Sequence, residues 1–245
     1  MTKAETDAPG PESGLSGAAV GRARRARSIE AASIAGVAYS VLTILALIQF
    51  SRYPSLAVGD EELTAWFDDD AHQAWLIGAL ALASIGSIAF LWFVAVIRRR
   101  LGDLEDKFFA TVFLGSGIVY VAVWLTGAAA LAAPAVAMTQ LDAGTVSAGS
   151  ATLAGGLGTS LILVVAPRLQ AVFIFTTSTV IMRSRVLPSW LAVVGYLTGL
   201  LLFVAPLVLQ PMGLLFPVWV AVVSVVLLLK HPTDLAPDHP EAEAS

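Results

Sequence analysis

The stretch that decides the fold is AWLIGALALASIGSIAFLWFVAVI, residues 74–97, which is followed directly by Arg98, Arg99 and Arg100. It contains no charged residue. An α-helix rises about 1.5 Å per residue and the hydrocarbon core of a bilayer is about 30 Å thick, so this stretch is long enough to cross it. We therefore predict a transmembrane helix that ends at a basic cluster.

Five more apolar stretches lie at 31–50, 108–136, 156–182, 188–209 and 212–229. The composition agrees, because 57% of the residues are hydrophobic and 13% are charged, against about 45–50% and about 25% in soluble domains. The sequence predicts an all-α protein, a polytopic membrane helix bundle. Its six transmembrane helices form one domain over residues 28–231.

The basic residues indicate how this bundle is oriented. Twelve of the fourteen fall in segments that the six spans place on one side of the membrane, namely Lys3, Arg22, Arg24, Arg25, Arg27, Arg98, Arg99, Arg100, Lys107, Arg183, Arg185 and Lys230. Basic residues in short flanking segments stay in the cytoplasm. We predict a multi-pass plasma-membrane protein with both termini cytoplasmic. Arg52 and Arg168 depart from the pattern.

Both ends of the chain have the composition of disordered tails. Residues 1–27 are rich in Ala, Gly, Glu and Pro, and residues 232–245 combine proline with acidic residues. The first tail ends in a polybasic collar, Arg22, Arg24, Arg25 and Arg27, which we expect to bind anionic lipid rather than nucleic acid. The first apolar stretch is too long for a secretory signal, so we interpret it as an uncleaved anchor.

Residues 51–73 form a sizeable outer loop. Gly59 and Asp60 predict the start of a short helix in which Leu63, Trp66 and Phe67 share one face, as in a helix lying on the membrane interface. The acids at 68–70 can cap the second span. They could instead hold a divalent cation through oxygen ligands, but their spacing matches no calcium loop, and we predict no metal site.

Arg168 is an ionisable residue that lies deep in a predicted span. It is 15 residues from Arg183, which marks the cytoplasmic boundary of that span. This separation is about 22 Å along a helix, which places Arg168 in the outer third of the hydrocarbon core. Arg168 could extend its stem to the headgroups or form a structural pair, or it could contact a ligand in the bundle. The partners considered are Asp142, the acids of 60–70, or a bound anion.

Two other residues complete the candidate polar site. Pro167 frees the carbonyl of Leu163 and is expected to kink the helix. Thr179 lies on the same helix face as Arg168 and belongs to a Thr-Thr-Ser-Thr run at 176–179. Its hydroxyls either bond back to helix carbonyls or line a polar path.

Small residues recur every fourth position in three spans, at Ala32-Gly36-Ser40, Ala79-Ala83-Ser87 and Gly195-Gly199. Such stripes let helices approach closely. They allow the helices of the bundle to pack together, or they allow two copies of the chain to form a homo-oligomer through Gly195 and Gly199.

The segment Gly155–Gly158 is interpreted as a flexible outer loop. Standard catalytic and nucleotide-binding signatures are absent, so no catalytic residue and no cofactor is predicted.

Two blocks of sequence carry a family resemblance. They are Phe90–Arg98 continuing to Phe113–Gly117, and Arg168–Phe173 continuing to Leu187–Gly195. These blocks resemble uncharacterised multi-pass membrane proteins of actinobacterial type. The resemblance implies a bacterial plasma-membrane protein and no particular activity.

Three functions are compatible with these observations. The first is a structural or regulatory membrane protein whose loops and tails engage partners. The second is a small transporter or channel that uses Arg168 for an anionic or polar solute. The third is a membrane enzyme, which would need a convergent cluster that the sequence does not show.

Overall fold

The computed structural model describes residues 11–55, 57–101, 107–140, 146–184, 187–204 and 213–229. Within these ranges the regular elements are helices and no strand is present. In chain order they are α1 (Pro11–Phe50), α2 (Asp60–Phe67), α3 (Asp70–Leu101), α4 (Lys107–Gln140), α5 (Ala148–Ser160), the π-helical turn η1 (Leu161–Val165), α6 (Ala166–Ser184), α7 (Ser189–Val204) and α8 (Leu215–Leu229).

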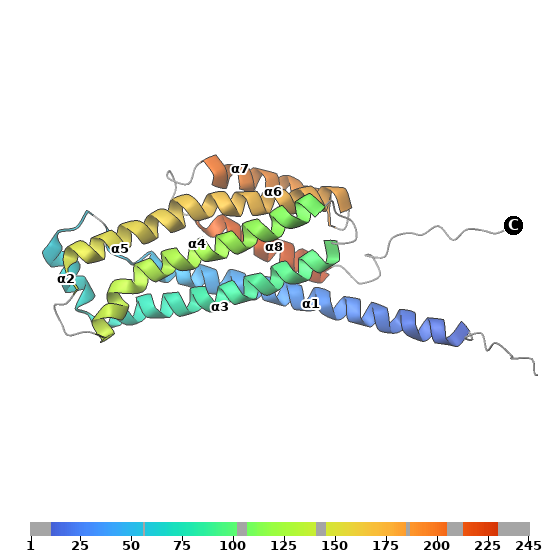
Figure 1. The fold of residues 1–245 in the computed structure, drawn as a ribbon, viewed down its shortest axis with the longest axis horizontal. Coiled ribbons are helices and arrows are strands. Elements are labelled where there is room, and N and C mark those ends of the chain that lie inside the picture. Colours follow the sequence, from blue (N-terminus) through green and yellow to red (C-terminus); the bar gives the residue numbers. More distant parts are fainter. Residues whose placement is uncertain are drawn as a thin grey trace, which may run out of the picture.

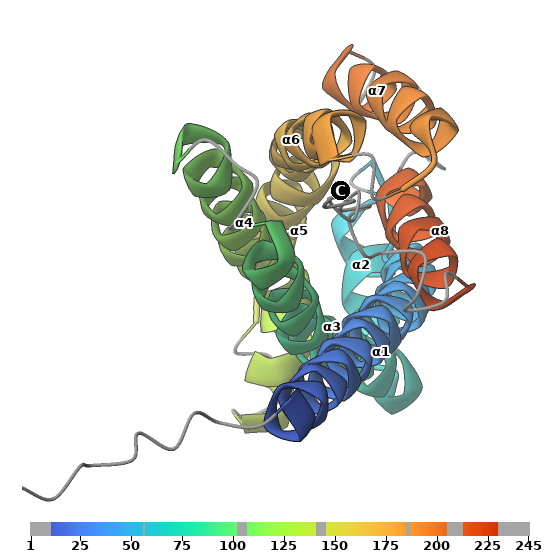
Figure 2. The same ribbon diagram turned by 90° about the vertical axis from the view of Figure 1, so that its right-hand side faces the viewer.

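The long helices form a closed ring. Each helix contacts the next one round the ring, in the order α1, α3, α4, α6, α7 and α8, and α8 contacts α1. Figure 2 shows this ring end on. Helices α5, η1 and α6 join into one continuous rod (Figure 1). The short helix α2 lies at one end of the bundle, which we call the α2 end.

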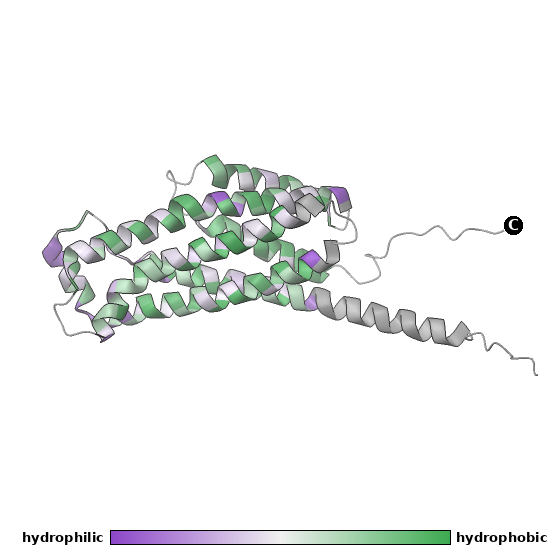
Figure 3. Cartoon of the chain, in the orientation of Figure 1, coloured by the Kyte–Doolittle hydropathy of each residue, from purple (hydrophilic) through white to green (hydrophobic). Residues whose placement is uncertain are grey.

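Four helical segments of the described chain are long and apolar enough to cross a membrane: Glu30–Phe50, Asp70–Arg98, Thr111–Gln140 and Ala148–Arg183. Figure 3 shows hydrophobic residues along the helices and hydrophilic colour at α2 and toward the opposite end. The all-helical class is therefore confirmed. These four apolar helices are suited to insertion into a membrane.

The described parts of the remaining two apolar helices are shorter than the predicted spans. Helices α7 and α8 have 16 and 15 residues, which corresponds to about 24 Å and about 22 Å. We predicted spans over 188–209 and 212–229, but residues 205–212 lie outside the described part of the chain. Both short helices lie toward the end of the bundle away from α2 (Figure 1).

Two predicted boundaries differ from the structure. Helix α1 begins at Pro11, whereas we predicted a disordered tail through residue 27; alanine and arginine in this segment are good helix formers. The glycine-rich segment Gly155–Gly158 belongs to α5 and is not a flexible loop. Its glycines allow close helix contacts, because a Cβ at Gly155 or Gly158 would lie within 3 Å of neighbouring atoms.

The short helix α2 is present where the sequence predicted it. Gly59 precedes it in an extended conformation, and three acidic residues occupy its first turn, next to the positive end of the helix dipole. Its apolar face packs on the bundle rather than lying free at an interface, because Leu63 and Phe67 are buried. Asp69 caps α3 by accepting a hydrogen bond from the Ala71 amide at 2.8 Å.

The small-residue stripes pack helices of this chain together. Ala79 and Ala83 are fully buried, in the helix α3 that packs closely against α1. Gly195 faces Ser178 and Gly199 faces Phe175, both on α6. A homo-oligomer through these two glycines would have to separate α7 from α6.

Candidate functional site

Pro167 determines the local shape of the predicted polar site. Proline has no amide hydrogen, and its ring would collide with the carbonyl four residues earlier in an α-helix, that of Leu163. The preceding turn widens into η1, in which the Ala166 amide donates to the Leu161 carbonyl. Pro167 is therefore accommodated by a π-turn, a common device at functional positions, and the rod continues through it.

Arg168 is half-buried directly after this turn. Its Nη1 donates a hydrogen bond to the carbonyl of Val164 on the same helix, not to Leu163, the carbonyl that we expected to be free. Among the described residues Arg168 forms no ion pair, so the predicted pairing with acids of 60–70 is not observed. Asp142, the other predicted partner, lies outside the described residues.

The packing of α7 on α6 places Arg168 beside the last described turn of α7. The two helices are antiparallel, with Gly195 opposite Ser178 and Gly199 opposite Phe175. Continuing this register places Val204, the last described residue of α7, within one helical turn of Arg168 along the axis.

Thr179 does not share this site. It lies 11 residues from Arg168, which is about 16 Å along the helix. Its hydroxyl donates to the Phe175 carbonyl at 2.9 Å and lies 2.8 Å from the Tyr196 hydroxyl. Thr176 and Thr177 also donate to carbonyls one turn earlier. Back-bonding within α6 therefore accounts for these threonine hydroxyls.

The centre of the ring is filled by aromatic side chains. One comes from each of five helices, and all five are fully buried. We call this set the aromatic plug; it consists of Tyr39, Phe90, Tyr120, Phe173 and Phe216. The ring centre of Phe90 lies 4.8 to 5.7 Å from those of the other four. These distances are typical of favourable aromatic pairs.

A polar pair lies within the plug. The hydroxyls of Tyr39 and Tyr120 are 2.7 Å apart, and the Gln170 side chain lies beside the Tyr120 hydroxyl. The Gln170 amide oxygen is buried and has no hydrogen-bond partner among the described residues. We did not predict this cluster from the sequence. The signal was available, because Tyr39 and Tyr120 lie well inside apolar spans, whereas tyrosine in membrane proteins is enriched at the interfaces.

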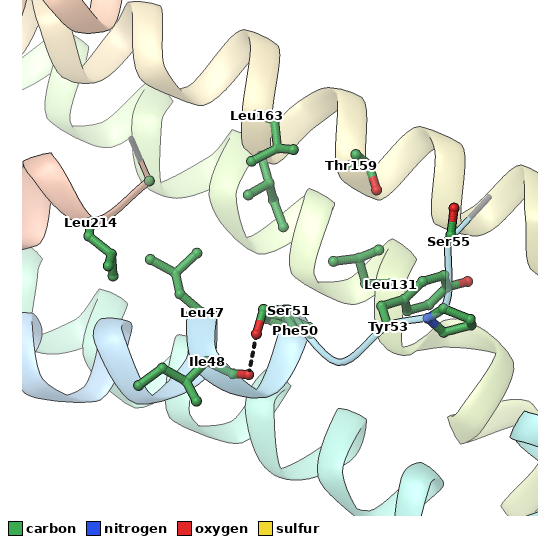
Figure 4. Close-up of a pocket in the computed structure, with 13 residues that line it drawn as sticks. Leu47, Ile48, Phe50, Ser51, Tyr53, Ser55, Leu131, Thr159, Leu163 and Leu214 are labelled. Atoms are coloured by element: carbon green, nitrogen blue, oxygen red, sulfur yellow. Dashed lines mark hydrogen bonds between the residues drawn. The ribbon is translucent and has the colours of Figure 1, made fainter. Parts of the chain in front are cut away.

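A groove of about 600 Å³ lies between α1 and the α5–η1 rod. Figure 4 shows Leu47 of α1 on one side and Leu163 and Thr159 on the other, with Leu214 at one end and Tyr53 at the other. The groove contacts the π-turn, but Arg168 does not line it. Ligand sites of about 300–1,000 Å³ with mostly apolar walls and a few polar groups are common in proteins.

Tyr53 fixes the α2 end of this groove. Its hydroxyl donates to the Ala151 carbonyl of α5 at 3.0 Å, and its ring contacts Trp66 and Phe67 of α2. Partial burial raises the pKa of Tyr53 to about 12. The hydroxyl therefore stays protonated and able to donate at neutral pH, so the link from α1 to α5 is insensitive to ordinary changes of pH.

The polybasic collar falls in the first half of α1, where the structure describes the backbone but not the side chains. Among the described residues no group of three or more metal-ligating side chains is present. Comparison of the chain with protein-family models, curated proteins and solved structures found no match.

The contact of Arg168 with Val164 leads to a stability prediction. We expect Arg168→Leu to lower the free energy of unfolding by about 1–2 kcal/mol, because a charged hydrogen-bond donor is lost from the turn around Pro167. Arg168→Lys should recover part of this loss. Thermal unfolding in detergent measures both. A leucine variant at least as stable as the wild type would show that Arg168 merely extends toward headgroups.

Proposed function

We propose that this chain is an integral plasma-membrane protein with six transmembrane helices and both termini in the cytoplasm, acting as a structural or regulatory component. The orientation is supported by the twelve basic residues on one side. Helices α7 and α8 are counted as spans because the predicted stretches continue beyond their described ends. The chain then crosses the membrane six times.

The aromatic plug is the observation that carries the functional proposal. Five fully buried rings from α1, α3, α4, α6 and α8 meet at the centre of the ring. A conduit needs a continuous polar path, and this centre is filled with apolar side chains around one tyrosine pair. The bundle is therefore better suited to hold a fixed arrangement than to pass a solute.

The alternative is a small transporter or channel for an anionic or polar solute. It requires a polar path that reaches Arg168. The groove beside the π-turn does not include Arg168 among its lining residues, and the guanidinium bonds its own helix. A membrane enzyme is the third alternative, and no arrangement described above favours a particular reaction.

The proposed topology predicts where reporter fusions will be active. A reporter that works only in the cytoplasm should be active when fused at Ser245 and inactive when fused at Asp142, because three predicted spans separate a cytoplasmic N-terminus from Asp142 and six separate it from Ser245. A second reporter that works only outside should give the opposite result. Both fusions on the same side would contradict the six-span topology.

A further inference from the structure

We propose that the groove between α1 and η1 binds a phospholipid of the outer leaflet, with an acyl chain in the groove and the phosphate beside Arg52. This inference rests on the proposed membrane topology. It gives a role to one of the two basic residues that depart from the cytoplasmic pattern. It also gives a role to a groove that the proposed function leaves unused.

The groove lies at the level where lipid tails meet headgroups. The first span, Glu30–Phe50, has 21 residues, or about 30 Å, so its end lies near the outer edge of the hydrocarbon core. Groove residues Leu47, Ile48 and Phe50 belong to its last turn. The opposite wall, from Thr159 to Leu163, lies about 30 Å or more from Arg183. Both walls therefore place the groove at the outer edge of the core.

Exposed apolar residues border the groove. Gly213 and Leu214, which directly precede α8, line its floor. Exposed apolar residues such as Ile48 and Leu157 lie on the same two walls or next to them. At this depth the surrounding medium is lipid. An acyl chain matches both the apolar walls and the medium that reaches them.

Arg52 supplies the charge that a phosphate requires. It lies between the groove residues Ser51 and Tyr53 at the mouth of the groove. Its side chain does not line the groove itself, and its guanidinium lies 4.6 Å from the ring centre of Trp75 on α3. Although many acidic residues lie in the same loop, Arg52 forms no ion pair within the described part of the chain. Arginine presents a planar set of donors that suits phosphate oxygens. The Ser51 and Tyr53 hydroxyls already donate to backbone carbonyls, so the Ser55 hydroxyl is the one at this end that can donate to an ester group.

The size of the groove can be changed at one position with little strain. A Cβ at Gly213 would come no closer than 3.7 Å to Leu47, which is ordinary contact. Gly213→Leu therefore fills the groove from its floor. Gly156→Leu is the matched control, because a Cβ at Gly156 meets no atom within 4 Å and Gly156 does not line the groove.

The test is native mass spectrometry of the delipidated full chain in detergent, with added dioleoylphosphatidylglycerol. We expect one bound phospholipid per chain and about tenfold weaker binding in Gly213→Leu, because the leucine side chain occupies volume that the acyl chain would fill. Gly156→Leu should bind as the wild type does. Thr159→Phe fills the opposite wall and carries the test if Gly213→Leu is not monodisperse.

Two further probes separate the parts of the proposal. Inorganic phosphate should neither bind nor displace the phospholipid, and Arg52→Gln should reduce phosphatidylglycerol binding to the level of dioleoylglycerol. Equal phospholipid binding by wild type and both groove variants would overturn the groove assignment, and an inert Arg52→Gln would overturn the headgroup assignment. A chain released from membranes by carbonate would contradict the proposed function itself, before any lipid is added.

Discussion

Phe90→Ala should destabilise the bundle by about 3–5 kcal/mol, the range for removing a buried phenylalanine side chain. Phe90 is fully buried and contacts the other four rings of the aromatic plug. These rings come from four other helices, so no single helix can move to fill the space. Thermal or denaturant unfolding in detergent, followed by tryptophan fluorescence, measures the loss.

Trp92→Ala is the matched control for this prediction. Trp92 lies two residues further along α3 and is 69% exposed on the outside of the bundle. It loses an even larger aromatic side chain, but it leaves no cavity among helices. We expect its unfolding to stay close to that of the wild type in detergent. If both variants lose the same stability, the plug does not hold the ring together.

The helices were predictable because their physical cause lies in local sequence. Apolar stretches of about 20 residues, such as the one before Arg98, predict a span by length alone. The short helix α2 followed from its acidic first turn and from the spacing of Leu63 and Phe67. The extent of α1 did not follow, because composition indicated disorder where helix propensity is also high. The position of each helix in the ring depends on packing between distant segments.

The candidate site was predictable only in part, for the same reason. Pro167 indicated a disturbed helix, and the π-turn is its local response. The partner of Arg168 was not predictable, since the Val164 carbonyl competes with acids whose positions depend on the whole fold. The pairing of Tyr39 with Tyr120 joins residues 81 apart in the chain. No spacing rule brings such residues together, and only the arrangement of α1, α3 and α4 does so.

Glycine gives a second test of how the ring is held together, at the contact of α4 with α5. Gly127 and Gly158 face each other there. A Cβ at Gly158 would lie 2.8 Å from the Gly127 carbonyl oxygen and 2.7 Å from Leu131, and a Cβ at Gly127 would lie 3.2 Å from the Gly158 carbonyl oxygen. Backbone atoms cannot rotate out of the way as a side-chain end can. The two helices are in contact because neither residue has a side chain.

Gly158→Ala should therefore lower the free energy of unfolding by about 1–3 kcal/mol, the usual cost of an extra methyl group in a packed interior. The control is Gly156→Ala, two residues earlier in the same helix, where a Cβ meets nothing within 4 Å. There the change should be neutral or stabilising by up to about 1 kcal/mol, because alanine favours the helix over glycine. The two variants differ only in which face of α5 carries the methyl group, so their thermal unfolding in detergent isolates the packing term. Equal unfolding temperatures would mean that α4 and α5 do not approach each other through Gly127 and Gly158.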